Sequence, residues 1–183
     1  MPAEARASDA RPPVVVVGAG GPRRGVADIL APAGRDVLGP FARALGPEFG
    51  RARDLVVALG DSTRRVELCK AILRAGGVLA TAVPPSAVVA GGGRVGGGAY
   101  VWAAAVIGAG ASVGRFCIVN TAAVVDHDCR VEDGAFLAPG VRLCGGVTVG
   151  AGAFLGAGAI VLPGMRIAAG ARVRAGTVVD ADF

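Results

Sequence analysis

Residues 119–149 read VNTAAVVDHDCRVEDGAFLAPGVRLCGGVTV, and this stretch decides the fold. Within it an aliphatic residue returns every six positions, and the same spacing continues in both directions along the chain. An α-helix repeats every 3.6 residues and a β-strand every 2.0, so neither element alone keeps a period of six. Short strands joined by tight turns of constant length do keep it.

The aliphatic series covers residues 89–179 without a gap. It consists of Val89, Val95, Val101, Ile107, Val113, Val119, Val125, Val131, Leu137, Leu143, Val149, Leu155, Val161, Ile167, Val173 and Val179. Two residues before these positions lies a second set, whose members are small or Val apart from Met165. Both sets are expected to point into a narrow core.

The six-residue unit is interpreted as one short strand followed by one turn. Three units would close a triangular coil, and successive coils would stack at the parallel-strand spacing of roughly 4.8 Å. Such a unit cannot bury its apolar face alone, so its stability comes from neighbouring coils. The alternative, a disordered tract rich in Gly and Ala, would not hold the aliphatic residues in register. The pattern therefore predicts a parallel β-solenoid.

The charge of the chain is concentrated before the repeat. The 183 residues carry a formal net charge of +5, and Lys70 is the only lysine. Twelve basic and eight acidic residues precede Ser86, so most of the excess lies in the N-terminal part. This balance suits an anionic small molecule such as a nucleotide diphosphate, whereas few aromatics and no basic run argue against nucleic acid. A general bias toward arginine is the alternative explanation.

The four cysteines, Cys69, Cys117, Cys129 and Cys144, lack metal-ligand spacing, and two of them occupy inward positions of the repeat. They are interpreted as small core residues in a reducing compartment, and no metal is expected. Residues 1–13 lack the long apolar stretch that a signal peptide needs. No apolar run in the sequence is long enough to span a membrane. We expect a cytoplasmic protein without a membrane partner.

The N-terminal part begins with an expected disordered tail, residues 1–13. Val14 to Val17 form a β-branched run that predicts a buried strand, and Gly18, Gly20 and Gly21 lead from it into a helix at about residues 23–30. A strand that passes through glycines into a helix N-terminus can bind an anion. Arg23 stands where the dinucleotide fingerprint needs its third glycine, so no nicotinamide cofactor is expected. The alternative is that these glycines serve packing alone.

The chain then alternates between strand and helix signals. Residues 31–54 predict an irregular connection, with a short helix at about residues 41–45. A second strand is expected at residues 55–59, a helix at 64–74 capped by Ser62 or Thr63, and a third strand at 78–83. Pro84-Pro85 then ends the unit. The pattern predicts a small Rossmann-like parallel α/β domain over residues 14–86, followed by the solenoid domain over residues 87–183.

The residues that precede the aliphatic series point outward and stack into three rows. One row contains Arg94, Ser112, Arg130, Thr148 and Arg166, and the other two are mostly apolar: Tyr100, Ile118, Phe136, Phe154 and Arg172, and Val106, Val124, Arg142, Ile160 and Val178. Two apolar outer faces predict burial against other copies of the chain, as in a closed cyclic trimer. The alternative is that the N-terminal domain covers one of them.

The chemistry is expected at His127, the only histidine of the chain. It falls in a turn between Asp126 and Asp128, either of which could fix its tautomer and raise its basicity. One coil further on, the same turn position is Gly145, followed by Gly146, where a backbone N–H is not shielded by a side chain. A base beside such an N–H is the arrangement that acyl transfer needs. The alternative is an ordinary surface histidine.

The hexapeptide repeat resembles the left-handed β-helix of the hexapeptide acyltransferases, an exception to right-handed crossovers. The segments 14–21, 60–62, 120–129 and 138–140 together look like the PglD/NeuD-type sugar acetyltransferases. The resemblance implies a homotrimer that uses acetyl-CoA to acetylate an amino group, or a hydroxyl, of a sugar. It implies a catalytic base at His127, an orienting acid at Asp128, a site asparagine at Asn120 and a thioester-binding amide at Gly145.

The resemblance also implies where the two substrates bind. The nucleotide part of the sugar is expected at Gly18, Gly20, Gly21 and Asp61, and CoA at Phe136, Gly145, Gly146, Arg166 and Arg172. Two histidines of the family pattern are replaced here, by Pro84 and by Phe136, and the family's Gly-Val-Pro-Ala tail is missing. The leading expectation is an acetyl-CoA-dependent N-acetyltransferase of a nucleotide-linked amino sugar. The alternatives are a sugar O-acetyltransferase and a trimeric binding protein that has lost turnover.

Overall fold

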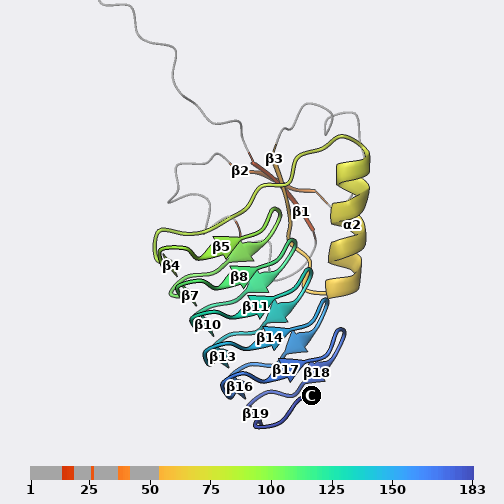
Figure 1. Cartoon of the computed structure of the whole chain (residues 1–183). Helices are drawn as coiled ribbons and strands as arrows, with labels where there is room; N and C mark the ends of the chain where they lie inside the picture. The colour runs from red at the N-terminus through yellow and green to blue at the C-terminus, as the bar shows by residue number, and fades with distance from the viewer. Residues whose placement is uncertain (1–13, 19–25, 27–36, 42–53) are drawn as a thin grey trace, which may run out of the picture.

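A computed structural model describes residues 14–18, 26, 37–41 and 54–183. The predicted tail, most of the helix expected at 23–30 and the short helix expected after Phe41 lie outside these residues. Figure 1 shows a stack of coils that extends away from a small N-terminal sheet, with helix α2 alongside the first coils. No helix in the described ranges is both long and apolar enough to cross a membrane.

The predicted solenoid is confirmed, with one two-residue strand in every six-residue unit. The strands form three parallel sheets. We call the first the valine face: β4 Val88–Val89, β7 Val106–Ile107, β10 Val124–Val125, β13 Arg142–Leu143, β16 Ile160–Val161 and β19 Val178–Val179. The arginine face contains β5 Arg94–Val95, β8 Ser112–Val113, β11 Arg130–Val131, β14 Thr148–Val149 and β17 Arg166–Ile167. The docked face contains β6 Tyr100–Val101, β9 Ile118–Val119, β12 Phe136–Leu137, β15 Phe154–Leu155 and β18 Arg172–Val173.

Each strand pairs with the strand one coil away in strict register. For example, Val125 pairs with Ile107 on one side and Leu143 on the other. The aliphatic residues from Val101 onward are buried in one continuous core, together with most of the small residues two positions before them. This arrangement places every residue of a turn directly over the residue eighteen positions earlier.

The turns explain many of the glycines. One residue of each turn adopts a positive φ, the left-handed region in which a Cβ is disfavoured. Glycine holds this place in most turns, whereas Ala104, Phe116, Ala122 and Asp128 hold it with φ between 55° and 60°. These four exceptions fall within the first coils, where the N-terminal part and the candidate site lie.

The N-terminal part contains a three-stranded parallel sheet in the order β2-β1-β3. Its strands are β1 Val14–Val17, β2 Val37–Phe41 and β3 Asp54–Val57, and helix α2 covers Ser62–Arg74. The strands at 14–17 and 55–59 and the helix were predicted correctly, within two residues at their ends. Strand β2 was missed because Gly39 and Pro40 interrupt its pattern; it is an edge strand whose pairing register shifts at this point, where proline is tolerated.

Two other local predictions were wrong. The segment expected to be a strand at 78–83 makes only isolated bridges, from Leu79 to Leu55 and from Ala82 to Tyr100. It passes from the edge of the N-terminal sheet to the first coil within a few residues, so it stays beside each partner for too short a distance to form a ladder. The cap of α2 is Asp61, whose Oδ1 accepts a hydrogen bond from Arg64 N at 2.8 Å, rather than Ser62 or Thr63.

The N-terminal part packs on the docked face. Tyr100 and Ile118 are buried there against residues of β1 and β3, including Val14 and Val56. The expectation that two apolar faces remain for other copies of the chain was therefore wrong for the first coils of this face, where the N-terminal part takes the place of a neighbour. On the valine face, in contrast, Val88 and Val178 keep 57% and 55% of their surface exposed.

Arg65 fastens α2 to the solenoid. It is the one charged residue that is fully buried in the described part of the chain. Its Nε and Nη2 donate to the carbonyls of Phe116 and Gly134, both at 2.8 Å, and Nη1 donates to Leu59 O at 2.9 Å. Burial lowers the pKa of Arg65. The guanidinium thus connects the helix, the loop before it and two successive coils.

Candidate active site

His127 lies in the turn that joins β10 to β11, at the corner between the valine and arginine faces. We call the turns at 108–111, 126–129 and 144–147 the base corner. The side chain is 63% exposed, as predicted for a residue that leaves the core. Its backbone N–H donates to Asp126 Oδ1 at 2.7 Å, so Asp126 shapes the turn.

Asp128 orients the imidazole of His127 through a hydrogen bond to one of its two ring nitrogens. Its Oδ2 lies 2.9 Å from His127 Nδ1. A hydrogen on Nδ1 donates to this carboxylate, which leaves the lone pair of Nε2 available to a substrate. Asp128 has a φ of 58°, and its N–H donates to Ala109 O at 3.0 Å. The unusual backbone geometry therefore places the carboxylate beside the ring.

Gly110 contributes to this geometry, although the sequence reasoning did not single it out. A Cβ on Gly110 would lie 2.6 Å from Asp128 Oδ1. The missing side chain makes room for the carboxylate one coil away. The contact between Gly110 and Asp128 could have been predicted from the sequence, because the two positions are eighteen residues apart and therefore stack on successive coils.

The carboxylates make His127 a stronger base. The hydrogen bond that His127 donates to Asp128 and the negative charge of Asp126 raise the pKa of His127 above its ordinary value. A raised pKa strengthens the affinity of Nε2 for a proton but reduces the fraction of free base at a given pH. The pair can thus accept a proton from an attacking nucleophile, with Asp128 stabilising the charged imidazole.

Gly145 lies directly against the imidazole, as the repeat predicted. A Cβ placed on Gly145 would collide with Nε2 and Cε1 of His127. The N–H of Gly146 donates to His127 O at 2.9 Å, which fixes the spacing of the two coils. Within the described ranges the N–H of Gly145 makes no hydrogen bond. A base and an unpaired backbone donor are therefore adjacent, which is the pair of groups that acyl transfer requires.

Replacement of Gly145 by alanine is expected to lower kcat of acyl transfer tenfold or more, because the new methyl group must displace the imidazole by more than the tolerance of a reacting geometry. Gly91→Ala is the matched control. Gly91 holds the same turn position at the same corner, and an added Cβ meets nothing within 4 Å. Steady-state kinetics of both variants check this, and equal kinetics would contradict the contact.

Asn120 is not beside His127 within one chain. It lies in the turn before β10, at the corner between the docked and valine faces, and the whole width of the valine face separates the two residues. We call the turns at 102–105, 120–123 and 138–141 the asparagine corner. Asn120 Oδ1 accepts hydrogen bonds from Thr121 N at 2.8 Å and from Thr121 Oγ1 at 3.3 Å.

The residues expected to bind CoA fall on two surfaces. Gly145 and Gly146 lie at the base corner, and Arg166 lies two coils beyond Arg130 on the arginine face. Phe136 and Arg172 lie on the docked face, at the opposite side of the prism from His127. There the guanidinium of Arg172 stacks over Phe154 at 4.7 Å, and the rings of Phe136 and Phe154 are 5.2 Å apart.

The residues expected to bind the nucleotide are only partly described. Gly20 and Gly21 lie outside the described residues. Gly18 follows β1, and a Cβ there would lie 2.5 Å from Ala58 O, so this glycine permits the close approach of two chain segments. Asp61 caps α2. Both residues thus have structural functions in the chain itself.

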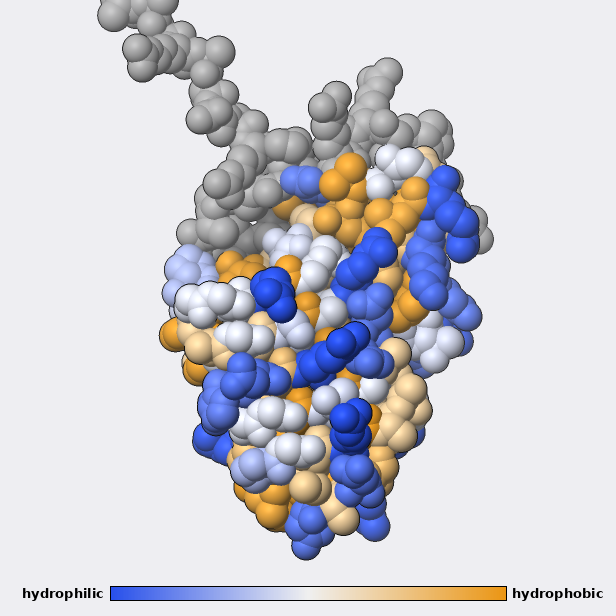
Figure 2. Space-filling model, viewed as in Figure 1, coloured by the Kyte–Doolittle hydropathy of each residue, from blue (hydrophilic) through white to orange (hydrophobic). Residues whose placement is uncertain are grey.

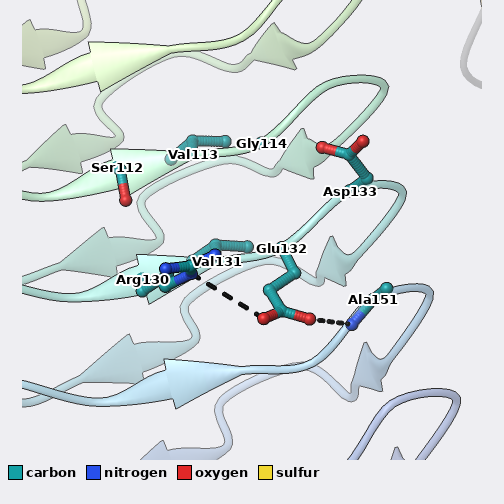
Figure 3. A pocket seen from close by; sticks show the side chains of 8 residues that line it. All are labelled: Ser112, Val113, Gly114, Arg130, Val131, Glu132, Asp133 and Ala151. Carbon is teal, nitrogen blue, oxygen red and sulfur yellow. Dashed lines mark hydrogen bonds and ion pairs between the residues drawn. The ribbon is translucent and has the colours of Figure 1, made fainter.

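A depression on the arginine face, at the level of the base corner, is lined by Ser112, Arg130, Glu132, Asp133 and neighbouring backbone (Figure 3). Glu132 lies 3.7 Å from Arg130 Nε and accepts a hydrogen bond from Ala151 N at 3.2 Å. Asp133 Oδ1 accepts from Arg115 N at 2.7 Å. These carboxylates connect adjacent coils, and no group of them in the described residues is arranged to hold a metal ion. Hydrophilic residues continue down this face (Figure 2).

Comparisons with known proteins agree with this geometry. Residues 128–163 match the family model described as "Bacterial transferase hexapeptide (six repeats)". A search of curated proteins found no match. The structure is similar to PerB from Caulobacter crescentus, solved in complex with CoA and GDP-perosamine, with 38% identity and a TM-score of 0.89 over 97% of this chain and 93% of that one.

A second similar structure is the acetyltransferase domain of PglB from Neisseria gonorrhoeae, with 29% identity and a TM-score of 0.87 over 94% of this chain and 93% of that one. Together with the family match, these similar structures show that the chain is an acyltransferase of the hexapeptide-repeat class. Within that class, the chain belongs to the PglD/NeuD-type sugar acetyltransferases of the left-handed β-helix superfamily. The family expected from the sequence is confirmed.

Proposed function

We propose that this protein is an acetyl-CoA-dependent N-acetyltransferase of a nucleotide-linked amino sugar. The observation that carries the proposal is the packing of the His127–Asp128 pair against Gly145, whose backbone N–H has no partner among the described residues. A perosamine N-acetyltransferase among its similar structures supports transfer to nitrogen. In this proposal residues 14–86 form a Rossmann-like domain that binds the nucleotide sugar, and residues 87–183 carry the acyl transfer.

The reaction follows from the atoms at the base corner. The amine of the sugar attacks the thioester carbonyl of acetyl-CoA, and Nε2 of His127 accepts the proton that the nitrogen loses. Asp128 stabilises the resulting imidazolium. The N–H of Gly145 donates to the oxyanion, and collapse of the tetrahedral intermediate expels the CoA thiolate, which can take the proton back from His127.

The exposed valine face supports a cyclic homotrimer. Three copies with their valine faces toward a common axis bury these residues, because the docked face already carries the N-terminal part. In this arrangement the base corner of one subunit lies beside the asparagine corner of the next. His127 and Asn120, which are separated within a chain, then line the same seam.

The residues expected to bind CoA would also lie together at this boundary between two subunits, which we call the seam. The arginine face of one subunit and the docked face of the next flank the seam, so Arg166 of one copy approaches Phe136 and Arg172 of the other. A cationic and aromatic groove suits the phosphates and adenine of CoA. The four free cysteines suit a cytoplasmic location, where thiols remain reduced.

Mixing two inactive variants tests the seam. His127→Ala and Asn120→Ala are each expected to be impaired, whereas subunits refolded together should regain about a quarter of the wild-type activity, because random assembly leaves both residues intact at that share of seams. No gain on mixing would contradict a shared site. Mixing each variant with itself is the control.

The function itself is tested by release of CoA thiol from acetyl-CoA in the presence of GDP- and UDP-linked amino sugars and of free sialic acids. The proposal predicts turnover of a nucleotide-linked amino sugar and an N-acetylated product by mass spectrometry. Turnover of a sialic acid alone would show an O-acetyltransferase instead. No thiol release with any acceptor would contradict the proposal and favour a binding protein.

A further inference from the structure

One charged residue interrupts the outward row of the valine face. Arg142 is exposed, and its strand places it between Val124 on one side and Ile160 on the other. Within the described ranges its guanidinium makes no hydrogen bond or ion pair. The other members of the row are all apolar: Val88, Val106, Val124, Ile160 and Val178.

The two corners that border the valine face supply little counter-charge for Arg142. The turns of the asparagine corner, at 102–105, 120–123 and 138–141, contain no acidic residue. At the base corner, Asp126 accepts a hydrogen bond from His127 N at 2.7 Å, and Asp128 Oδ2 lies 2.9 Å from His127 Nδ1. The carboxylates of this region therefore serve the histidine turn, and the valine face itself has none.

The proposed trimer brings three copies of Arg142 to one level of its axis. Arg142 points outward from the valine face, and these faces surround the axis, so symmetry places three guanidiniums around it at the same height. Three positive charges among valine and isoleucine side chains repel one another, and removing them from water adds a further cost. A charge inside an apolar interface is tolerated when it is paired. One anion on the axis would pair all three.

We propose that the trimer binds one small oxyanion, such as phosphate or sulfate, on its three-fold axis between the three Arg142 side chains. The inference rests on the trimer of the proposed function. It places a site on the valine face, whereas the residues expected to bind CoA lie at the base corner and on the other two faces. A tetrahedral oxyanion suits this symmetry, because three of its oxygens can each face one guanidinium. Chloride would balance charge but offers a single acceptor atom.

Calorimetric titration with inorganic phosphate tests the site, because symmetry sets its stoichiometry. Wild type is expected to bind one phosphate per three chains, and Arg142→Met is expected to lose this binding. Arg94→Met is the matched control, since Arg94 is an exposed arginine at the same outward position of a strand on the arginine face. Phosphate bound only at one per chain, or a one-in-three site that survives in Arg142→Met, would overturn the proposal. Equally tight binding of chloride would exclude a site shaped for an oxyanion.

The stability of the trimer gives a second readout, measured by sedimentation equilibrium over a dilution series. In phosphate-free buffer of low salt, Arg142→Met should form a tighter trimer than wild type and than Arg94→Met, because it removes the repulsion at the axis. Phosphate at ten times its dissociation constant should lower the trimer dissociation constant of wild type about tenfold and leave that of Arg142→Met unchanged.

Two outcomes of this measurement would contradict the site. A weaker trimer of Arg142→Met in phosphate-free buffer would show that Arg142 pairs with a carboxylate of the neighbouring subunit instead. A wild type that stays monomeric at every phosphate concentration would overturn the site together with the trimer. Both readouts are independent of turnover, so an absence of acetyl transfer would contradict the proposed enzymatic function without deciding the anion site.

Discussion

Replacement of His127 by alanine is expected to lower kcat/KM for acetyl transfer on the order of a hundredfold or more. The imidazole is the only group at the base corner that combines a free lone pair with a carboxylate on its other nitrogen. Its loss leaves the Gly145 N–H and the binding surfaces in place. We therefore expect kcat to fall while KM for both substrates changes little. Initial rates of thiol release with saturating acetyl-CoA measure the effect.

Asp128→Asn supplies a graded control for this prediction. The carboxylate raises the pKa of His127, so its replacement by an amide should lower that pKa. The general base must be neutral, and activity is lost as the pH falls through the pKa of His127. The acidic limb of the kcat/KM profile should therefore move to lower pH in Asp128→Asn, while the maximal rate falls less than in His127→Ala. An unmoved limb, or an alanine variant that retains wild-type kcat, would exclude His127 as the base.

Replacement of Arg65 by methionine is expected to reduce the free energy of unfolding by about 2–6 kcal/mol, because two buried carbonyls lose their donors at a cost of about 1–3 kcal/mol each. Methionine fills much of the same volume but leaves the carbonyls of Phe116 and Gly134 buried without their donors. The loss should appear first as release of α2 from the solenoid. Urea denaturation followed by circular dichroism gives the change in midpoint.

Arg64→Met is the matched control for Arg65. Arg64 is the adjacent residue on the same helix, and its side chain is exposed. Its substitution removes the same charge and should change the free energy of unfolding by no more than about 0.5 kcal/mol. Equal effects of the two substitutions would show that net charge, rather than the hydrogen bonds of Arg65, stabilises the junction.

The repeat was predictable because the residues that each unit requires lie within six positions of one another in the sequence. Each six-residue unit needs one aliphatic residue, one small residue and a turn, so the sequence displays the same requirement sixteen times. The family resemblance added the left-handed sense of the β-helix and the expectation of acetyl transfer. His127 and Gly145 could be paired from sequence because the coil length alone brings positions eighteen apart together.

The N-terminal part was less predictable because its strands depend on distant partners. Val37–Phe41 contains Gly39 and Pro40 and pairs only as the edge of a sheet. Residues 78–83 are apolar enough for a strand but join two structures in turn. Local preference cannot show which neighbour a short segment will pair with.

The sequence by itself determined the solenoid, the register of its coils and the corner that carries His127. Only the tertiary structure decided which outer face is covered and that Arg65 is buried where α2 meets the solenoid. It also separated Asn120 from His127 across the valine face. The physical reason is that a repeat fixes contacts within its own period, whereas contacts between the repeat and the N-terminal part depend on how two unrelated surfaces fit together.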